Sequence, residues 1–362
     1  YLAFREVVAS LSDLLTGQCA VAKMLTALLF PEETWFCFFE VQWQKGQGAP
    51  TEKTALESTE RRKCMPGENK VAKLSDITKV IKDGDRVAVG GSWLGSHPMA
   101  IIREIIRSKI KNLTAITVVG SIDVDMLIGA GCLSRLMFSF VSMEAFGLAP
   151  NFRRAIEKEG LPYDEITGLA VIIGLEAGGR NVPFLPYRGP FGSDLVKYRP
   201  EFYKDIKCPF TGEELIAAAA IVPDVAIIHA TRADHAGNVQ IEGTSGTDIE
   251  MMRAAKKRIV SVEEIVTDEE IRKNPEKTKI PKFQVDMLIE APLGAHPCSC
   301  APDYVFDPWH IMKYMQAATS PETFKQYLDE YVMKPEFEYL EAIGGMRQAA
   351  ILRRLAREVK FL

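Results

Sequence analysis

Residues 83–98, DGDRVAVGGSWLGSHP, decide the fold. Within this stretch Arg86–Val89 carries two β-branched valines and predicts a buried strand. The strand ends in Gly90 and Gly91, and Pro98 suits the first position of a helix. A strand, a glycine-rich turn and a helix in succession can aim backbone N–H groups at an oxyanion.

The turn itself supports two interpretations. Its glycines either relieve backbone strain at a tight connection, or they let the backbone approach a ligand and stabilise negative charge. Under the second interpretation the candidate oxyanion loop consists of Gly90, Gly91, Ser92, Trp93, Leu94 and Gly95. A dinucleotide site is excluded, because G-x-G-x-x-G is absent and no acidic residue follows at the right strand end.

Outward from this stretch, short β-branched runs alternate with amphipathic segments from Leu74 onward. This alternation is typical of helices packed on a mostly parallel sheet, so the predicted fold class is α/β. Further strands are predicted at residues 113–119, 136–141, 225–229, 258–262 and 285–290.

Three regions are predicted along the chain. Residues 1–64 lack a starting Met and form an N-terminal extension, either an over-extended reading frame or a divergent addition. Residues 65–306 form the main domain, in which residues 180–211 are a long irregular passage of the kind that builds sites or interfaces. Residues 307–362 form a C-terminal helical cap.

Composition excludes several classes of protein. The 362 residues are 47% hydrophobic and 25% charged, which suits a soluble enzyme. The net charge of −4 has no long single-sign blocks, so neither nucleic acid nor an anionic membrane is a predicted partner. The seven cysteines are scattered, which predicts a reducing cytoplasm, and no apolar run approaches the roughly 20 residues that cross a bilayer.

Residues 83–98 resemble the α-subunit signature of family I CoA transferases: Asp-Gly, three aliphatic residues, Gly-Gly-Phe, three variable residues, Gly, any residue, Pro. The chain departs from this pattern at Ser92, where the family has Phe, and at Ser96, where it has Gly. The resemblance extends over residues 73–333. It includes FVSME at 140–144, VPFLPYR at 182–188, DHAGN at 234–238 and EAPLGAHP at 290–297.

The resemblance implies a NagB/RpiA-like fold and a heteromeric enzyme that moves CoA from an acyl-CoA thioester to a carboxylic acid. In that family a glutamate of the β subunit, within a Ser-Glu-Asn-Gly motif, carries the CoA as a glutamyl-CoA intermediate. The motif is absent here. A β-type partner, in an α₂β₂ assembly, is therefore expected to supply the nucleophile, with CoA as substrate and no bound cofactor.

The chain also resembles the IpdA subunit of a steroid-ring-cleaving hydrolase, which implies a second possible reaction. The α-type chain of that enzyme supplies a catalytic glutamate, together with an arginine in the Pro-rich loop. Arg188 matches the arginine, but the glutamate maps to Thr167 or Gly168, with Glu165 the nearest carboxylate. The mismatch favours the transferase, and a catalytically silent scaffold is the third alternative.

Three further residues are candidates for substrate binding. Arg188 binds the acceptor carboxylate or braces its loop, Glu144 lines the acyl pocket or has structural duties, and Asn238 contacts substrate or caps a turn. The segment His296-Pro297-Cys298-Ser299-Cys300 lacks the separated ligand pairs of a structural zinc site, so no metal is predicted.

Overall fold

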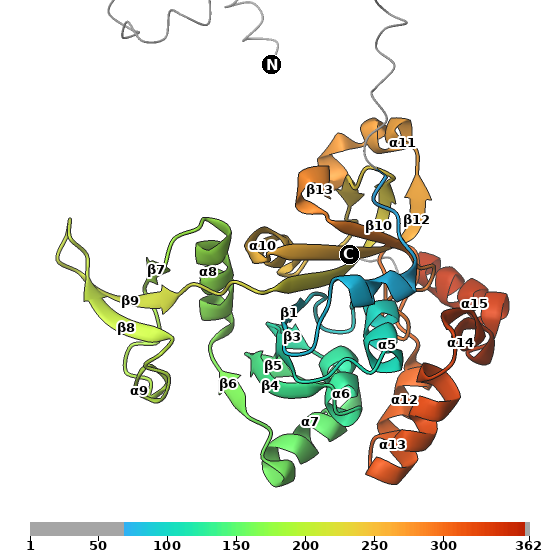
Figure 1. Ribbon diagram of the computed structural model, residues 1–362, viewed down its shortest axis with the longest axis horizontal. Helices are drawn as coiled ribbons and strands as arrows, with labels where there is room; N and C mark the ends of the chain where they lie inside the picture. The colour runs from blue at the N-terminus through green and yellow to red at the C-terminus, as the bar shows by residue number, and fades with distance from the viewer. Residues whose placement is uncertain (1–68, 359–362) are drawn as a thin grey trace, which may run out of the picture. The chain divides into compact units, whose positions relative to one another are not determined.

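The structure is a computed structural model that describes residues 69–358. The predicted extension at residues 1–64 lies outside these residues. A nine-stranded sheet forms the centre (Figure 1). Its strands are β1 (Arg86–Val89), β2 (Leu113–Ile116), β4 (Leu133–Phe138), β6 (Tyr163–Glu165), β10 (Val225–Asp234), β11 (Val239–Gln240), β12 (Lys257–Val266), β13 (Thr278–Ile280) and β14 (Met287–Glu290).

Seven of these strands are parallel, in the order β14-β12-β10-β1-β2-β4-β6. β11 and β13 add an antiparallel extension at the long end of β10. Parallel neighbours need crossover connections, which the intervening helices supply. The predicted α/β class with a mostly parallel sheet is confirmed.

The sheet separates two hydrophobic cores. Val87 and Val89 of β1 face one core, whereas Ala88 faces the other, as the two-residue period of a strand requires. The helices α5 (Met99–Arg107) and α6 (Ile122–Gly129) contribute to the first core, and α8 (Gly168–Gly179) and α10 (Asp248–Ala254) to the second.

The strand prediction at Arg86–Val89 is confirmed. Residues 113–119 instead divide into β2 and β3 (Val119–Gly120), and residues 136–141 fall partly in β4 and partly in β5 (Phe140–Val141). β3 and β5 leave the main sheet and form a separate parallel pair. This pair brings Phe140 beside the loop that follows β1, where Trp93 lies.

The passage at residues 180–211, expected to be irregular, contains regular structure. It holds β7 (Phe184–Tyr187), the short helix α9 (Leu195–Tyr198) and β8 (Tyr203–Lys207), and both strands pair antiparallel with β9 (Glu214–Ala219). We call residues 184–219 the arm; it projects at the left of Figure 1. Pro186 hid the strand β7, but β7 is an edge strand, where proline is tolerated.

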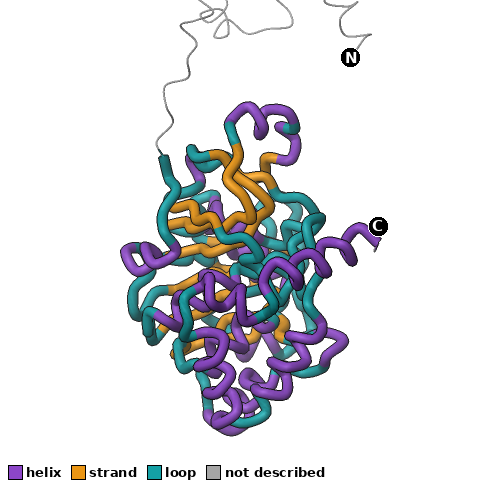
Figure 2. The backbone as a smooth tube through the Cα atoms, turned by 90° about the vertical axis from the view of Figure 1, so that its right-hand side faces the viewer, coloured by secondary structure: helices purple, strands orange, loops and turns teal. Residues whose placement is uncertain are grey.

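The C-terminal part is helical, as predicted. It comprises α12 (Pro308–Ala317), α13 (Pro321–Tyr327), α14 (Glu336–Ala342) and α15 (Gly345–Glu358). In the side view α15 runs to the C-terminal mark at the edge of the molecule (Figure 2). These helices share the first core with α5 and α6, so the domain boundary at residue 307 stays a prediction. Among the described residues, no helix is long and apolar enough to cross a membrane.

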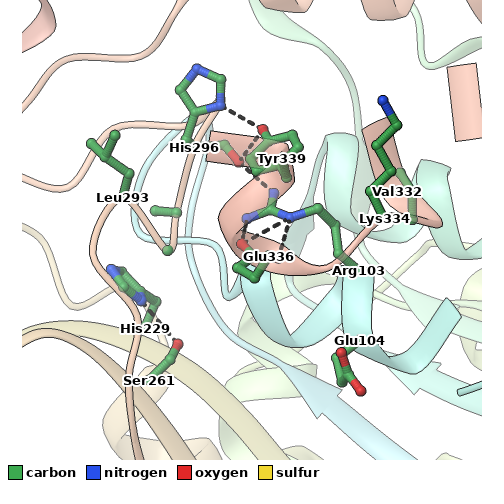
Figure 3. A network of polar contacts seen from close by, with 12 residues as sticks. Arg103, Glu104, His229, Ser261, Leu293, His296, Val332, Lys334, Glu336 and Tyr339 are labelled. Carbon is green, nitrogen blue, oxygen red and sulfur yellow. Dashed lines mark hydrogen bonds and ion pairs between the residues drawn. The ribbon is translucent and has the colours of Figure 1, made fainter. Parts of the chain in front are cut away.

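A buried polar network fastens these helices to the sheet domain (Figure 3). Arg103 of α5 is 1% exposed, pairs with Glu336 of α14 and lies over the Tyr339 ring at 3.8 Å. Its Nη1 also donates to the carbonyl of His296 at 2.9 Å. The helical cap is thereby tied to the turn that contains His296, and this turn leads on to Ser299 beside the loop after β1.

Candidate active site

The loop at residues 90–96 follows the carboxyl end of β1, where ligands bind in open parallel sheets. Ser92 and Gly95 exchange two backbone hydrogen bonds, with N···O distances of 3.0 and 2.9 Å. Trp93 and Leu94 therefore form the tip of a tight turn. Trp93 and Ser96 both have positive φ, at 58° and 55°, so the turn is held in a backbone conformation that side chains rarely adopt.

Most N–H groups of this loop have partners within the chain. Gly90 donates to the Ile227 carbonyl and Ser96 to the Ser299 carbonyl, at 2.9 and 2.7 Å. Gly91 donates to Oδ1 of Asp248 at 2.9 Å. Between residues 90 and 96, only the N–H groups of Trp93 and Leu94 lack a partner in the described part of the chain. The predicted oxyanion loop thus offers two free donors, both at its tip.

The two glycines make room for the chain's own side chains. A Cβ on Gly90 would lie 2.5 Å from Oδ1 of Asp248, and a Cβ on Gly91 would lie 2.6 Å from Nδ1 of His97. Gly91 also has φ +94°, which favours glycine. The inner side of the loop is therefore packed against two ionisable groups.

His97 and its partner Asp123 lie completely buried behind the loop. The His97 Nδ1 is 2.8 Å from Oδ2 of Asp123, and its Nε2 is 2.7 Å from the carbonyl oxygen of Trp93. Burial opposes the charged imidazole, but the Asp123 carboxylate outweighs it and raises the pKa of His97.

Asp248 supports the loop from α10. Burial raises the pKa of its carboxyl to about 7, although the Gly91 N–H favours the carboxylate. Its Oδ2 is buried without a hydrogen-bond partner among the described residues. On the opposite side, Ser299 donates to the Leu94 carbonyl from its backbone N at 2.8 Å and from its Oγ at 3.1 Å. The loop is thus clamped from two sides.

The outer side of the tip is apolar and open. The Trp93 side chain is 54% exposed, and its ring centroid lies 6.1 Å from that of Phe140, which is 45% exposed. The chain continues from β5 to Glu144, whose φ of 56° is unusual for a residue with a side chain. Burial raises the pKa of Glu144, and its Oε1 is buried without a partner among the described residues. Backbone strain and an unsatisfied carboxylate are typical of functional sites.

The structure gives Arg188 and Asn238 partners of their own. Arg188 lies on the arm, 77% exposed in its side chain, and makes a two-bond contact with Glu213 at 2.7 and 3.0 Å. Asn238 lies in the turn between β10 and β11, where its Nδ2 donates to Asp234 at 2.6 Å and its Oδ1 accepts from the Lys282 N–H at 3.1 Å. These contacts favour loop bracing and turn capping; substrate binding by either residue stays a prediction.

No carboxylate occupies the position expected for a hydrolase glutamate. Thr167 is the N-cap of α8, where its side chain accepts from the Ala170 N–H at 3.3 Å, and Gly168 begins the helix. Glu165, the nearest carboxylate in sequence, is exposed at the end of β6.

One buried cluster has the side chains of a metal site, namely His229, Glu263 and Cys300. Both oxygens of Glu263 are already used: Oε1 by His229 Nε2 at 2.8 Å and Tyr304 Oη at 2.7 Å, and Oε2 by the Leu293 N–H at 2.8 Å. Burial also raises the pKa of the Cys300 thiol well above its usual value, which disfavours the thiolate that a metal needs. The cluster is explained by its own hydrogen bonds.

Comparison with known proteins settles the family. Residues 72–291 match the family described as coenzyme A transferase. The chain belongs to the coenzyme A transferase family. It is an α-type chain of that family, because relatives named as the corresponding subunits cover most of it at more than 30% identity.

Two such relatives illustrate the likeness. The chain is 36% identical to the A subunit of the 3-oxoadipate CoA-transferase from Pseudomonas knackmussii, over 71% of its own length and 90% of the relative. The crystal structure of glutaconate coenzyme A-transferase from Acidaminococcus fermentans superposes with a TM-score of 0.73 at 33% identity, over 77% of this chain and 94% of that one.

Other relatives show how varied the similar proteins are. The cholesterol ring-cleaving hydrolase IpdA subunit of Mycobacterium tuberculosis is 30% identical over 75% of this CoA-transferase chain and 95% of the relative. A protein of Archaeoglobus fulgidus is 39% identical over 77% of this chain, which spans 63% of that protein's length.

Sequence reasoning missed the residues that support the loop. His97 lies within the deciding stretch, directly before Pro98, but a lone histidine there carries no signal of its role. Asp123 and Asp248 are 26 and 151 positions from His97, and only the fold brings all three to the same loop. A buried acidic residue in an otherwise apolar helix start, such as Asp123 in α6, is the one available hint.

Proposed function

We propose that this α-type chain supplies the oxyanion-stabilising half of an enzyme that moves CoA from an acyl-CoA thioester to a carboxylic acid. One observation carries the proposal: the N–H groups of Trp93 and Leu94 are free at the tip of a loop whose other N–H groups, from residue 90 to residue 96, are engaged. Free, pre-positioned donors are what a tetrahedral acyl intermediate needs for its negative oxygen.

The proposed reaction proceeds through covalent steps. A glutamate carboxylate attacks the thioester carbonyl carbon, and the C–S bond breaks to release CoA thiolate and leave an acyl-glutamyl anhydride. The thiolate then attacks the glutamyl carbonyl, which forms glutamyl-CoA and frees the donor acid. An acceptor carboxylate repeats these steps in reverse and leaves as the new acyl-CoA. Each attack places negative charge on a carbonyl oxygen, for which we assign the Trp93 and Leu94 N–H groups.

The nucleophilic glutamate is proposed to lie on a β-type partner in an α₂β₂ assembly. Support comes from the absence of a Ser-Glu-Asn-Gly motif in this chain and from the exposed rings of Trp93 and Phe140, which offer an apolar surface beside the free donors. Glu144 is proposed to line the acyl pocket, since its carboxylate oxygen is buried and has no partner among the described residues. A cytoplasmic location follows as part of the same proposal.

Two other functions are less well supported. The hydrolase would need a carboxylate at Thr167 or Gly168, and its expected arginine, Arg188, is occupied by Glu213. A silent scaffold would have no use for two free N–H groups in a strained and buttressed turn. The relatives named for 3-oxoadipate and glutaconate suggest dicarboxylic acids as first substrates to try.

The test is CoA transfer by the assembled enzyme. The chain is co-expressed with the β-type protein encoded beside it, and the purified complex receives succinyl-CoA or glutaryl-CoA with glutaconate or 3-oxoadipate as acceptor. Acyl-CoA of the acceptor acid is the expected product by chromatography. Release of free CoA at the same rate with and without an acceptor would contradict the transferase and support the hydrolase.

A further inference from the structure

The orientation of the Leu94 N–H follows from the contacts of its own peptide group. The carbonyl of Trp93 and the N–H of Leu94 belong to one trans peptide, in which the two groups point in opposite directions. The Trp93 carbonyl faces inward, since it lies 2.7 Å from Nε2 of the fully buried His97. The Leu94 N–H must therefore point outward, to the side on which substrate can reach it.

His97 makes this contact as a donor at both ring nitrogens. Its Nε2 faces a carbonyl oxygen, which can only accept, and its Nδ1 faces Oδ2 of Asp123, whose Oδ1 accepts from the Ser121 N–H at 2.7 Å. A ring that donates from both nitrogens is an imidazolium. A cationic donor on the Trp93 carbonyl polarises the peptide, and this makes its N–H a stronger hydrogen-bond donor.

We infer that His97 and Asp123 are positioning residues of the reaction: the buried pair fixes and polarises the Trp93–Leu94 peptide so that the Leu94 N–H is a ready-made oxyanion donor. The inference rests on the proposed function, because it assigns the task of that donor to the transition state. Neither residue touches substrate, since both side chains are completely buried. Their role is exerted through the backbone alone.

Two substitutions at His97 separate its two hydrogen bonds. In His97→Gln the side-chain amide can reach the position of Nε2 and keep a donor on the Trp93 carbonyl, whereas in His97→Asn it can reach only the position of Nδ1 and Asp123. For the assembled enzyme, we expect His97→Asn to lower kcat by about 10²-fold with KM within about threefold, the effect of losing one oxyanion donor. His97→Gln should retain kcat within about tenfold, for the loss of one charge-assisted bond. Equal losses in the two variants, or no loss, would overturn the inference.

A structural readout keeps the test independent of the reaction. Crystal structures of the two variants should show the Trp93–Leu94 peptide rotated in His97→Asn and unchanged in His97→Gln; an unrotated peptide in His97→Asn contradicts the inference even if no CoA transfer is found. If transfer occurs in the wild type and both variants keep its kcat, only this inference fails. If the wild type transfers no CoA but the peptide rotates as expected, only the proposed function fails.

Two further variants deal with general destabilisation. His310→Asn is the matched control, a buried histidine in the helical cap whose Nε2 lies 2.8 Å from Tyr327 Oη, and it should reduce thermal stability without changing kcat. If His97→Asn does not assemble, Asp123→Asn removes the counter-charge with little change in size, and kcat should fall about tenfold. An unchanged kcat in Asp123→Asn would also overturn the inference.

Discussion

The loop at residues 90–96 and the arm at residues 184–219 hold their charges in opposite ways. Behind the loop, His97, Asp123 and Asp248 are completely buried, and their hydrogen bonds go to each other and to the backbone. On the arm, Arg188 and Glu213 pair with each other in an exposed position. Both are short ion or hydrogen-bond contacts, yet their environments differ completely.

The difference shows which contacts determine function. A buried group without its partner keeps its full desolvation penalty, so each polar atom behind the loop constrains the backbone strongly. An exposed pair exchanges readily with water and is screened by salt. The buried residues are therefore expected to control turnover, and the arm pair is expected to contribute little to it.

The largest expected effect comes from placing a methyl group inside the loop. Gly91→Ala puts a Cβ 2.6 Å from His97 Nδ1 at a φ of +94°, so the turn must shift. We predict that kcat falls by at least about 10²-fold, because both free donors move. Gly212→Ala is the matched control on the arm: its φ is +73° but nothing lies within 4 Å of the added Cβ, and kcat should stay at the wild-type value. Similar kinetics for the two variants would remove the distinction between loop and arm.

A smaller loss is expected when the acceptor of the Gly91 N–H is removed. Asp248→Ala should lower kcat about tenfold, the cost of one buried hydrogen bond to an acidic group. Asp248→Asn keeps an acceptor oxygen at this position and should stay within about threefold of the wild type. Steady-state kinetics of the two variants side by side provides the check, and a greater loss in Asp248→Asn would show that the charge, not the acceptor, is required.

Asp248 also makes a prediction about pH. Its pKa is about 7 in the folded chain against about 3.9 in an unfolded one, so the folded state binds the extra proton between these values. Its contribution to stability is complete below about pH 4 and is lost as pH rises towards 7, at a slope on the order of 1 kcal/mol per pH unit. Urea unfolding at about pH 5 and about pH 7 should therefore show a weaker pH dependence in Asp248→Asn. An unchanged dependence would contradict the assignment.

Glu144 should show stability and activity moving in opposite directions. Glu144→Gly relieves the positive φ and removes a buried carboxylate oxygen that has no partner among the described residues, which should stabilise the chain by about 1 kcal/mol. If Glu144 lines the acyl pocket, turnover should fall in the same variant. Thermal unfolding and kinetics measured on one preparation decide this, and a stabilised variant with full activity would leave Glu144 without a role in the reaction.

The smallest effect is expected on the arm. Arg188→Ala breaks only an exposed pair, so the unfolding midpoint should change by no more than about 1 °C. The KM for the acceptor acid should stay within about twofold. A rise of about tenfold in that KM would restore Arg188 as a substrate-binding residue and would place the arm beside the site.

The parts of the fold that sequence could predict are those encoded by local periodicity. The strand at Arg86–Val89, the helix after Pro98 and the C-terminal helices were foreseen in this way. The arm was not, because Pro186 interrupts the strand pattern and its acceptance depends on an edge position that only the sheet defines.

The candidate site divides along the same line. The loop was predictable from its glycines, but its active tip was not, since the assignment depends on which N–H groups find partners elsewhere. Asp248 and Ser299 supply such partners from distant positions. The likeness of Arg188 to a functional arginine, by contrast, gave no information about its partner Glu213 on the neighbouring strand.

The measurement that tests the central claim most directly is the mass of both chains of the complex once it has met acyl-CoA without an acceptor acid. The account predicts that the β-type partner gains the mass of CoA, less one water, that this chain stays unmodified, and that Gly91→Ala abolishes the gain. A CoA adduct on this chain, or an adduct that forms at the wild-type rate in Gly91→Ala, would contradict it.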